Sequence, residues 1–335
     1  MPLLEPAAAA FPYHPLVLLV AALVLEPLLG EARGPLRRLP HPVRLIGALI
    51  AFLDRKLNRP ERSPTDRRLR GVLVVAFVAG LAAAAGWAVA WVGRFVPFAW
   101  LAELALIIAL LAQRSLFQHV RAVAAALSEH GLDAGRAAVA HIVGRDVRQL
   151  DEHGVARAAV ESCAENFSDG IVAPVFWYVL FGLPGMLAYK AVNTLDSMIG
   201  YRSERHRAFG WASARLDDAL NLVPARLSGL LLSAAAVAVP EARPAAGVRT
   251  MLRDARLHRS PNAGWPEAAM AGALGLSLAG PRRYPGLVVD DPWIGGGTSR
   301  ATARDVARAL SLFVAACLLN GCLAAALAAA RLNVA

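Results

Sequence analysis

The sequence predicts an all-α, polytopic integral membrane helical bundle with re-entrant or broken helices and cytoplasmic helical excursions. Hydrophobic residues make up 57% of the 335 residues, charged residues only 18%, and the mean hydropathy is +0.46. Such a chain is too apolar for an ordinary soluble domain and too charged for a protein made only of spans. In addition, carboxylates, amides and arginines are concentrated beside the apolar segments, where ionisable groups are costly and usually mark a working site.

Six apolar stretches of about 18 residues, or slightly fewer, qualify as membrane elements. They lie at residues 14–29, 72–93, 96–112, 171–190, 221–240 and 306–330, and 221–240 is the weakest of them. The first lacks the basic segment of a cleaved signal peptide, so we interpret it as a retained span. We expect a single membrane domain over residues 1–335, with cytoplasmic excursions at 31–70, 113–170, 191–220 and 241–305.

The loop 31–70 carries eleven of the Lys and Arg residues that give the chain its net charge of +10. This distribution is typical of a cytoplasmic loop that obeys the positive-inside rule and contacts anionic headgroups. Nucleic-acid binding also uses basic segments, but no zinc finger, RNA-binding signature or basic patch interleaved with aromatics accompanies this one. We therefore expect the lipid bilayer among the partners and no nucleic acid.

The span 171–190 contains a helix-breaking sequence, Gly182-Leu183-Pro184-Gly185. A simple crossing would place the arginines of the following segment outside, against the positive-inside rule. Broken helices are tolerated at membrane depth where they line a cavity. We therefore favour two half-helices that form a re-entrant hairpin over a simple crossing, and the same argument applies to 221–240.

An acidic motif, ESCAENFSDG, precedes this span at residues 161–170. Glu161, Glu165 and Asp169 are spaced four residues apart, so they would share one face if the helix persisted. Ser168-Asp169-Gly170 suggests instead that the helix ends there. We expect this helix to bring an acidic cluster to the membrane surface.

A second motif, Asp217-Asp218-x-x-Asn221, places its three side chains on one face of a helix by spacings of three and four residues. Hard oxygen ligands in this geometry suit Mg²⁺ that bridges a phosphate, and a solvated helix start with an Asp cap would show the same pattern. Asn193 and Asp196 repeat the theme one turn apart. Metal ligation by Asp217, Asp218 and Asn221 and a structural helix start are therefore equally compatible with this motif.

Three further motifs allow both a binding and a structural interpretation. Arg145-Asp146-x-Arg148 would hold a phosphate or form an exposed ion-paired turn. His41 precedes an amphipathic helix that opens with Pro42, a position where histidine is more often a cap than a ligand. Ser260 and Asn262 belong to the rigid loop SPNAGWPE, which leads into a helix whose N-terminus would bind an anion favourably.

The order of these motifs is more specific than any single one. HPVRLIG at 41–47, GRDVRQLD at 144–151 and ESCAENFSDGIVAPVFW at 161–177 are followed by KAVNTLDSMIGYRSERHRAFGWASARLDDALNLVPARLSGLLL at 190–232 and RSPNAGWPEAAMAGALG at 259–275. Together they closely resemble the CobD/CbiB family of cobalamin biosynthesis, adenosylcobinamide-phosphate synthase, over about residues 26–312. One departure is Gly30-Glu31-Ala32, where the family tends to have Gly-Asp/Glu-Pro.

The resemblance implies a multi-pass ligase of the bacterial inner membrane. It would join a propionate carboxyl of the corrinoid adenosylcobyric acid to the amine of (R)-1-aminopropan-2-ol phosphate, or of aminopropanol, to give adenosylcobinamide phosphate or adenosylcobinamide. A carboxylate is a poor electrophile, so the reaction requires activation, which implies ATP as co-substrate and Mg²⁺ on its phosphate oxygens. Other membrane enzymes of the pathway become candidate partners.

The same resemblance gives the candidate residues their roles. Asp217, Asp218 and Asn221, with Glu165 and Asp169, are candidates for metal and base. The arginines would hold the amine's phosphate and the nucleotide. The candidate catalytic residues are Glu165, Asp169, Asp196, Asp217 and Asp218. The candidate substrate-binding residues are His41, Arg44, Arg145, Asn166, Asn193, Arg202, Asn221, Arg226, Ser260 and Asn262.

Two other functional classes fit part of this pattern. An intramembrane Mg²⁺-dependent prenyl-diphosphate transferase would also place Asp-rich motifs near helix ends, but the chain lacks a second clear Asp-rich repeat and has the long SPNAGWPE loop. A non-catalytic corrinoid transporter or scaffold would bind the substrate without consuming ATP. The sequence alone does not locate the ATP site or choose between the two amines.

Overall fold

The computed structural model describes residues 14–29, 41–144, 146–201, 203–284 and 287–333, and only the backbone of those within 282–289. Within it the chain divides into two compact units whose segments alternate along the sequence. Unit 1 comprises Met1–Ala112, Ala173–Asn221 and Leu323–Ala335, and unit 2 comprises Gln113–Val172 and Leu222–Cys322. The expectation of one membrane domain with cytoplasmic excursions stays a prediction.

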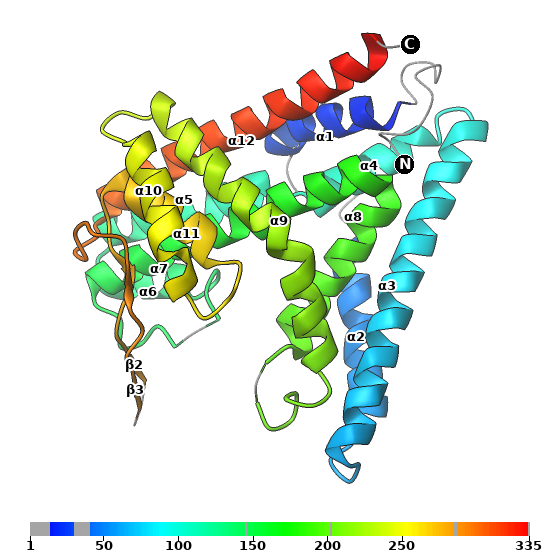
Figure 1. The fold of residues 1–335 in the computed structure, drawn as a ribbon, viewed down its shortest axis with the longest axis horizontal. Coiled ribbons are helices and arrows are strands. Elements are labelled where there is room, and N and C mark those ends of the chain that lie inside the picture. Colours follow the sequence, from blue (N-terminus) through cyan, green and yellow to red (C-terminus); the bar gives the residue numbers. More distant parts are fainter. Residues whose placement is uncertain (1–13, 30–40, 145, 202, 285–286, 334–335) are drawn as a thin grey trace. The chain divides into compact units, whose positions relative to one another are not determined.

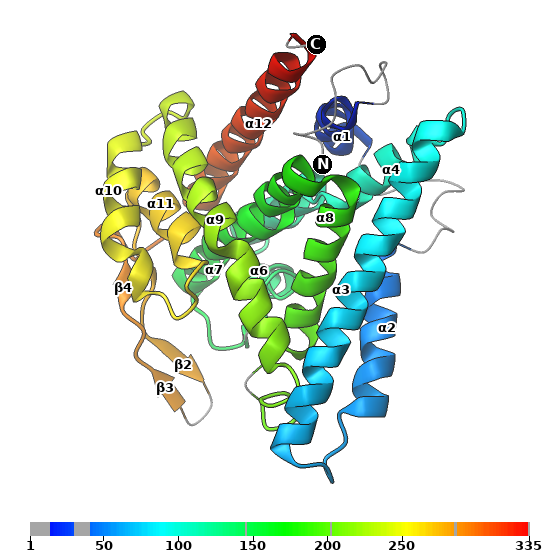
Figure 2. The same ribbon diagram turned by 45° about the vertical axis from the view of Figure 1, so that its right-hand side comes forward.

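Unit 1 is helical and is built around the packing of α3 against α8. Its helices are α1 (Pro15–Leu29), α2 (Pro42–Leu57), α3 (Pro64–Phe95), α4 (Trp100–Leu110) and α8 (Ala173–Ile199), with the first part of α9 (Trp211–Ala235) and the end of α12 (Ala303–Asn333). Helices α2, α3 and α8 run side by side in both views (Figures 1 and 2). Leu19, Ile50, Val78, Ile107 and Leu183 are fully or almost fully buried in its core.

Two helices of unit 1 begin at side-chain caps. The Val43 amide donates to His41 Nδ1 at 3.3 Å before α2, and the Asp66 amide donates to Ser63 Oγ at 3.2 Å before α3. Each cap is followed by proline, which suits the first helical position because its missing N–H would be unsatisfied there. The structural interpretation of His41, as a cap, is therefore confirmed.

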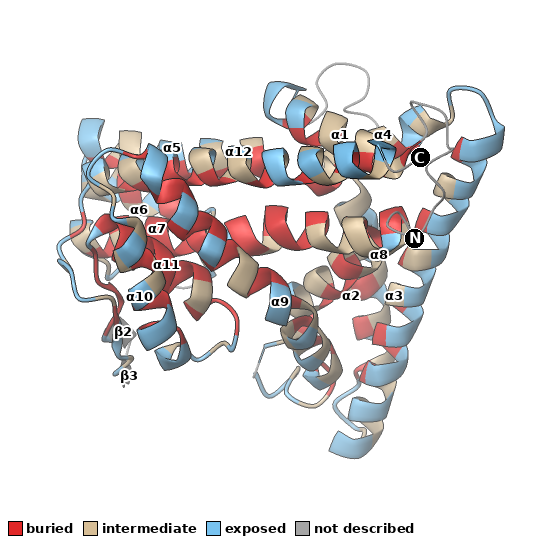
Figure 3. Ribbon diagram, turned by 45° about the horizontal axis from the view of Figure 1, so that its top comes forward, coloured by how far each residue is buried: buried red, intermediate tan, exposed pale blue. Residues whose placement is uncertain are grey.

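The outer face of α3 is apolar and exposed, as expected of a helix in contact with lipid. Figure 3 shows the exposed face along its length, which includes Leu73, Phe77 and Leu81. Near its end Trp87 and Trp91 stack with ring centroids 6.3 Å apart, and Phe95 contacts Trp91 at a tilt of 52° with centroids 5.0 Å apart. Such aromatics are typical of a membrane–water interface. Within the described residues five helices are long and apolar enough to cross a bilayer, so the chain is a multi-pass membrane protein.

The helices differ in extent from the predicted spans. The spans 72–93 and 306–330 lie inside α3 and α12, and most of 221–240 lies in α9 with the short 3-10 turn Ala236–Ala238 that follows it. The expected span 96–112 is wrong in its bounds, because α4 has only 11 residues. The apolar helical segment instead runs over Trp100–Glu129, including α5 (Gln113–Glu129).

The predicted break in the span 171–190 is present within α8. Gly182 has φ 68°, a left-handed backbone conformation that residues with a side chain rarely adopt, and Pro184 follows two residues later. The two parts of α8 are therefore separated by a kink whose sequence signal was Gly182-Leu183-Pro184-Gly185. Re-entry into the membrane, as opposed to a simple crossing, stays a prediction.

Unit 2 packs α7 at its centre. It contains α5, α6 (Leu132–Val139), α7 (Glu152–Phe167), α10 (Pro244–Asp254), α11 (Gly264–Leu274) and the remaining parts of α9 and α12. Most of α7 is buried (Figure 3). Two small antiparallel sheets add to the helices: β1 (Leu278–Ala279) with β4 (Trp293–Ile294), and β2 (Arg282–Tyr284) with β3 (Leu287–Val289).

The helix that carries the acidic motif does not end at Ser168, contrary to the sequence-based expectation. A π-helical turn, Ser168–Val172, continues α7 directly into α8, and the Ser168 amide donates to the carbonyls of Ala164 and Glu165. The π geometry inserts an extra residue into the turn and is frequent at functional sites. Glu161 is buried and its carboxylate accepts a hydrogen bond from the Ala279 amide at 2.8 Å, so it serves the packing of unit 2.

Close packing of α3 against the α8 break generates a testable prediction. A Cβ on Gly86 would lie 2.8 Å from the Pro184 nitrogen and 2.9 Å from the Leu183 carbonyl carbon. Because backbone atoms cannot move aside cheaply, Gly86→Ala should lower the free energy of unfolding by about 1–3 kcal/mol. Gly80→Ala is the matched control on the same helix, since nothing lies within 4 Å of its Cβ.

The measurement is the thermal midpoint of the two purified variants in one detergent. We expect Gly80→Ala to equal or slightly exceed the parent, because alanine favours the helix over glycine by roughly 0.5–1 kcal/mol. Equal midpoints for Gly86→Ala and Gly80→Ala would show that α3 does not approach the α8 break this closely.

Candidate functional site

A hydrogen-bonded polar cluster joins α8 and α9 within unit 1. The Asn193 amide donates to Asp217 Oδ1 at 3.3 Å, and the Asn221 amide donates to Asp217 Oδ2 at 3.0 Å. The Tyr189 hydroxyl donates to Asn221 Oδ1 at 2.9 Å. Asp217 and Asn221 are 9% and 2% exposed. The i,i+4 spacing of Asp217 and Asn221 thus brings these two of the three predicted side chains together.

This cluster holds a carboxylate away from bulk water. A buried carboxylate is tolerated only where hydrogen bonds replace its lost hydration. Asn193 and Asn221 supply one donor to each oxygen of Asp217, and Tyr189 fixes the orientation of the Asn221 amide. The carboxylate is therefore held in one position between two helices, as a reactive or ligand-binding group must be.

Asp218, the next residue, has a different environment. It is partly exposed and lines a pocket of about 320 Å³ together with residues of the 200–215 segment. The other lining residues are Gly200, Tyr201, His206, Arg207, Gly210, Trp211, Ala214 and Arg215. Asp217 thus belongs to the buried network, whereas Asp218 is accessible to a ligand. Asp196, on α8 one turn beyond Asn193, is also partly exposed.

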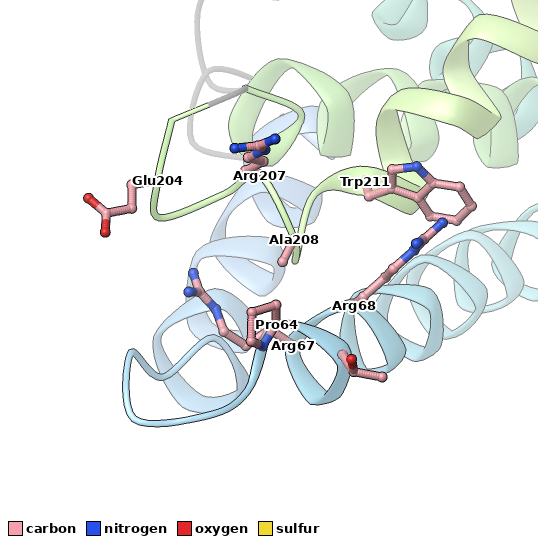
Figure 4. A pocket seen from close by; sticks show the side chains of 8 residues that line it. Pro64, Arg67, Arg68, Glu204, Arg207, Ala208 and Trp211 are labelled. Carbon is pink, nitrogen blue, oxygen red and sulfur yellow. The ribbon is translucent and has the colours of Figure 1, made fainter.

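A larger pocket of about 670 Å³ adjoins the first and shares Arg207 and Trp211 with it (Figure 4). The start of α3 contributes Pro64, Thr65, Arg67 and Arg68, and the segment before α9 contributes Glu204, Arg207, Ala208 and Trp211. Among the charged side chains around this recess, the arginines outnumber the single carboxylate of Glu204. We call it the basic pocket.

The segment that forms one wall of both pockets is held by Asp54 of α2. Arg205 Nη2 lies 2.6 Å from Asp54 Oδ2, and the Asn58 amide donates to Asp54 Oδ1 at 2.8 Å and to the Arg205 carbonyl at 3.1 Å. Burial alone would raise the pKa of the Asp54 carboxyl. The hydrogen bonds from Asn58 and Arg205 and the nearby positive charge outweigh burial and hold that pKa below its usual value.

The pH dependence of thermal stability tests how much the Asp54 carboxylate stabilises this segment. Because the pKa of Asp54 is lower in the folded state, its contribution is fully present above the unfolded pKa, about 4, and is lost as the pH falls through the folded pKa. Asp54→Asn should therefore lower the thermal midpoint at neutral pH, and the difference from the parent should shrink between about pH 5 and about pH 2. Arg205 is largely exposed, so the expected loss is about 1 kcal/mol.

The measurement is the thermal midpoint in detergent across that pH range. Glu61→Gln, an exposed substitution in the same part of the chain, should follow the parent throughout. A constant difference between Asp54→Asn and the parent at every pH would contradict the assigned role of the charge.

A second group of predicted residues lies together in unit 2. The guanidinium of Arg226 stands 4.3 Å from the centroid of the Trp265 ring and within 3.5 Å of Asn262 Oδ1. Ser260 Oγ accepts from the amides of Asn262 and Ala263 at 3.2 Å each, which shapes the loop. Arg226, Ser260 and Asn262 therefore form one structured group around the SPNAGWPE loop.

The remaining candidates are more dispersed. On the α7 side, Glu165 and Asn166 are exposed and Asp169 in the π turn is partly exposed, and the Asn166 amide donates to the Ser162 carbonyl at 2.9 Å. Arg44 is exposed on α2. The structure thus brings Asn193, Asp217 and Asn221 together in unit 1, and it places Glu165, Asn166 and Asp169 in unit 2. Arg145 and Arg202 lie outside the described residues.

Sequence reasoning missed Tyr189 and the arginines of the two pockets. Tyr189 lies four residues before Asn193 on α8, so helical spacing from the predicted site residue was a usable signal. Arg67 and Arg68 were interpreted only through the positive-inside rule. No spacing in the sequence connects them with Arg207 and Trp211, because tertiary packing brings these segments together.

The described residues contain no cluster of three or more His, Cys, Asp or Glu side chains arranged to hold a metal ion. Asp217 already accepts one hydrogen bond on each oxygen, and Asn221 is engaged at both ends of its amide. Protein-bound Mg²⁺ commonly takes one or two carboxylates and completes its shell with substrate phosphates and water. Asp218 lies on a pocket wall and could supply such a carboxylate. Asp217 directly precedes it in the sequence.

Comparison with known proteins places these motifs in context. A family model described as "CobD/Cbib protein" matches residues 19–313. A relative from Sinorhizobium sp is 49% identical over 312 residues, which cover 90% of this chain and 94% of the relative. Relatives from Brucella melitensis and Rhodobacter capsulatus are 48% and 49% identical and cover 89% and 88% of the chain and 92% of each relative. All three are named "Cobalamin biosynthesis protein CobD", and no solved structure matches.

Proposed function

The chain belongs to the CobD/CbiB family of cobalamin biosynthesis, and from this we propose that it is an ATP-dependent ligase that forms an amide bond. The acid partner is the propionate carboxyl of adenosylcobyric acid, and the amine partner is (R)-1-aminopropan-2-ol phosphate or aminopropanol. The product is adenosylcobinamide phosphate or adenosylcobinamide. The reaction takes place at the membrane surface, where a large amphipathic corrinoid can approach.

The observation that supports this proposal most directly is the cluster of Asn193, Asp217 and Asn221 beside the Asp218 pocket. Carboxylates in membrane helices are rare, and those that occur are usually hydrogen-bonded and functional. Here one carboxylate is fixed by two amides and the adjacent one is presented to a pocket that also contains Arg207 and Arg215. A negative and a positive group at one pocket suit a reaction between a phosphate-bearing molecule and an ammonium.

The proposed chemistry has two steps. An oxygen of the propionate attacks the terminal phosphorus of ATP, which forms an acyl phosphate and releases ADP. The substrate ammonium first gives one proton to a base, and the resulting amine nitrogen attacks the acyl carbon. Phosphate then leaves with the electron pair of the broken C–O bond, and the nitrogen loses a second proton. Each step develops negative charge on oxygen, which guanidinium groups stabilise, and the second needs a carboxylate near the ammonium.

The residues of unit 1 can perform these tasks. Asp218 is the accessible carboxylate that would attract the substrate ammonium and accept its proton, and Asp217 with its amide donors would keep the α9 segment in place. Arg207 and Arg215 would balance the charge of phosphate oxygens. Mg²⁺, which this proposal includes, would be held mainly by phosphate oxygens of the substrates with Asp218 as a protein ligand, and it would neutralise phosphate charge.

Product analysis tests the proposal. The purified full-length protein would be given adenosylcobyric acid, each amine in turn and Mg-ATP, and the products identified by mass. We expect an amide product with release of ADP and phosphate in equal amounts. Release of pyrophosphate from a prenyl diphosphate would instead support the transferase, and corrinoid binding without ATP consumption would support a transporter or scaffold.

Substitution of Asp217 and of Asp218 should both lower activity but should differ in their effect on thermal stability. Asp218→Asn should lower kcat by about 10²–10⁴-fold, because the pocket loses its proton acceptor, with the thermal midpoint unchanged. Asp217→Asn should also lower kcat, and should lower the midpoint too, because an added NH₂ group would face the amide donors of Asn193 and Asn221. Asp133→Asn is the control, since that side chain is 95% exposed on α6.

The measurement combines turnover with thermal midpoints for the three variants. Full activity in both Asp217→Asn and Asp218→Asn would exclude this cluster and move the metal and base to Glu165 and Asp169. A lower midpoint for Asp218→Asn, equal to that of Asp217→Asn, would show that Asp218 belongs to the buried network rather than to the pocket.

A further inference from the structure

We propose that the basic pocket between the start of α3 and the segment before α9 is a binding site for a phosphate group. Three arginines, Arg67, Arg68 and Arg207, line it against a single acidic residue, Glu204 (Figure 4). All of these residues belong to unit 1. Arginine is suited to phosphate because its planar guanidinium donates two parallel hydrogen bonds to phosphate oxygens.

Two of the arginines are held in place before any ligand arrives. The Arg67 Nε donates to Asn58 Oδ1 at 2.8 Å, and its Nη2 donates to the Arg205 carbonyl. The Arg68 guanidinium lies over the Trp211 ring, 3.6 Å from the centroid. These contacts fix the two side chains and lower the entropic cost of binding, since an ordered side chain loses less freedom when a ligand binds.

Within the part of the chain that the structure describes, ion pairs do not neutralise two of the three arginines of the pocket. Among the described residues, no carboxylate lies within ion-pair distance of Arg68 or Arg207. Stacking on an indole satisfies the face of a guanidinium but leaves its N–H groups available in the ring plane. An anion is therefore the ligand that these side chains would recognise, and a phosphate can accept from several of them at once.

The size and position of the pocket suit a phosphate on a larger molecule. Its volume of about 670 Å³ lies within the range of small-molecule sites. It shares Arg207 and Trp211 with the pocket of Asp218, so a ligand phosphate here would stand next to the proposed reacting groups. Assignment of that phosphate to ATP or to the phosphorylated amine rests on the proposed function, whereas phosphate binding itself does not.

The test measures phosphate binding by Arg207→Gln and by Arg55→Gln, a matched control on α2 that removes an exposed charge outside both pockets. In the first arm, the full chain in phosphatidylcholine nanodiscs is titrated with inorganic pyrophosphate. In the second arm, phosphatidylglycerol retained from mixed nanodiscs is counted by mass spectrometry. The first arm reports a soluble phosphate ligand, and the second reports a lipid headgroup.

We expect Arg207→Gln to weaken pyrophosphate binding about ten- to a hundredfold, the loss of a hydrogen bond to a charged group, with no effect in Arg55→Gln. Arg207→Lys should recover only part of the affinity, because lysine does not form the paired hydrogen bonds. A loss of phosphatidylglycerol alone would assign the phosphate to a lipid. Unchanged binding of both probes in folded Arg207→Gln, or equal losses in Arg55→Gln, would overturn the proposal.

This result is separable from the test of the reaction. Amide product from the parent together with unchanged binding in Arg207→Gln would refute the pocket and leave the ligase activity standing. Loss of pyrophosphate binding in Arg207→Gln together with no amide product from the parent would establish the pocket and refute the proposed activity.

Discussion

The arrangement of the candidate site depends on the cost of placing a carboxylate between membrane-associated helices. Asp217 is accommodated because Asn193 and Asn221 each donate a hydrogen bond to it and Tyr189 orients Asn221. These contacts fix the rotation of α9 relative to α8 within unit 1. The rotation in turn directs the neighbouring Asp218 toward the pocket that contains Arg207 and Trp211. The hydrogen bonds of the buried Asp217 carboxylate therefore determine where the accessible Asp218 carboxylate lies.

Much of the fold and part of this site could be predicted because they follow from local spacing. The break at Gly182 was evident from the adjacent glycines and proline, and the pairing of Asp217 with Asn221 followed from helical periodicity. The cap at His41 was likewise a local feature. The candidate residues Arg145 and Arg202 remain predictions, and so does the orientation of the loops relative to the membrane.

The parts that could not be predicted depend on tertiary packing or on competition between nearly equal local choices. The basic pocket joins Arg67 and Arg68 to Arg207 and Trp211, which lie about 140 residues further along the chain, and no periodicity links them. The helix through Ser168 continues as a π turn where the glycine after Asp169 favoured an end. Packing of the apolar residues on both sides, including Phe167 and Ile171, outweighed that local preference.

The alternation of segments between the two units has a consequence for how the protein is made. Ala324 of α12 packs in the same core as Leu18 and Leu19 of α1, although about 300 residues of chain separate them. Domains in newly synthesised chains ordinarily complete in order from the N-terminus. Unit 1 cannot do so, because its core lacks a member until the last helix has left the ribosome. The apolar residues of α1 that pack near Ala324 must therefore stay without this contact until α12 arrives, and truncation of α12 should harm a site that lies far from it in the sequence.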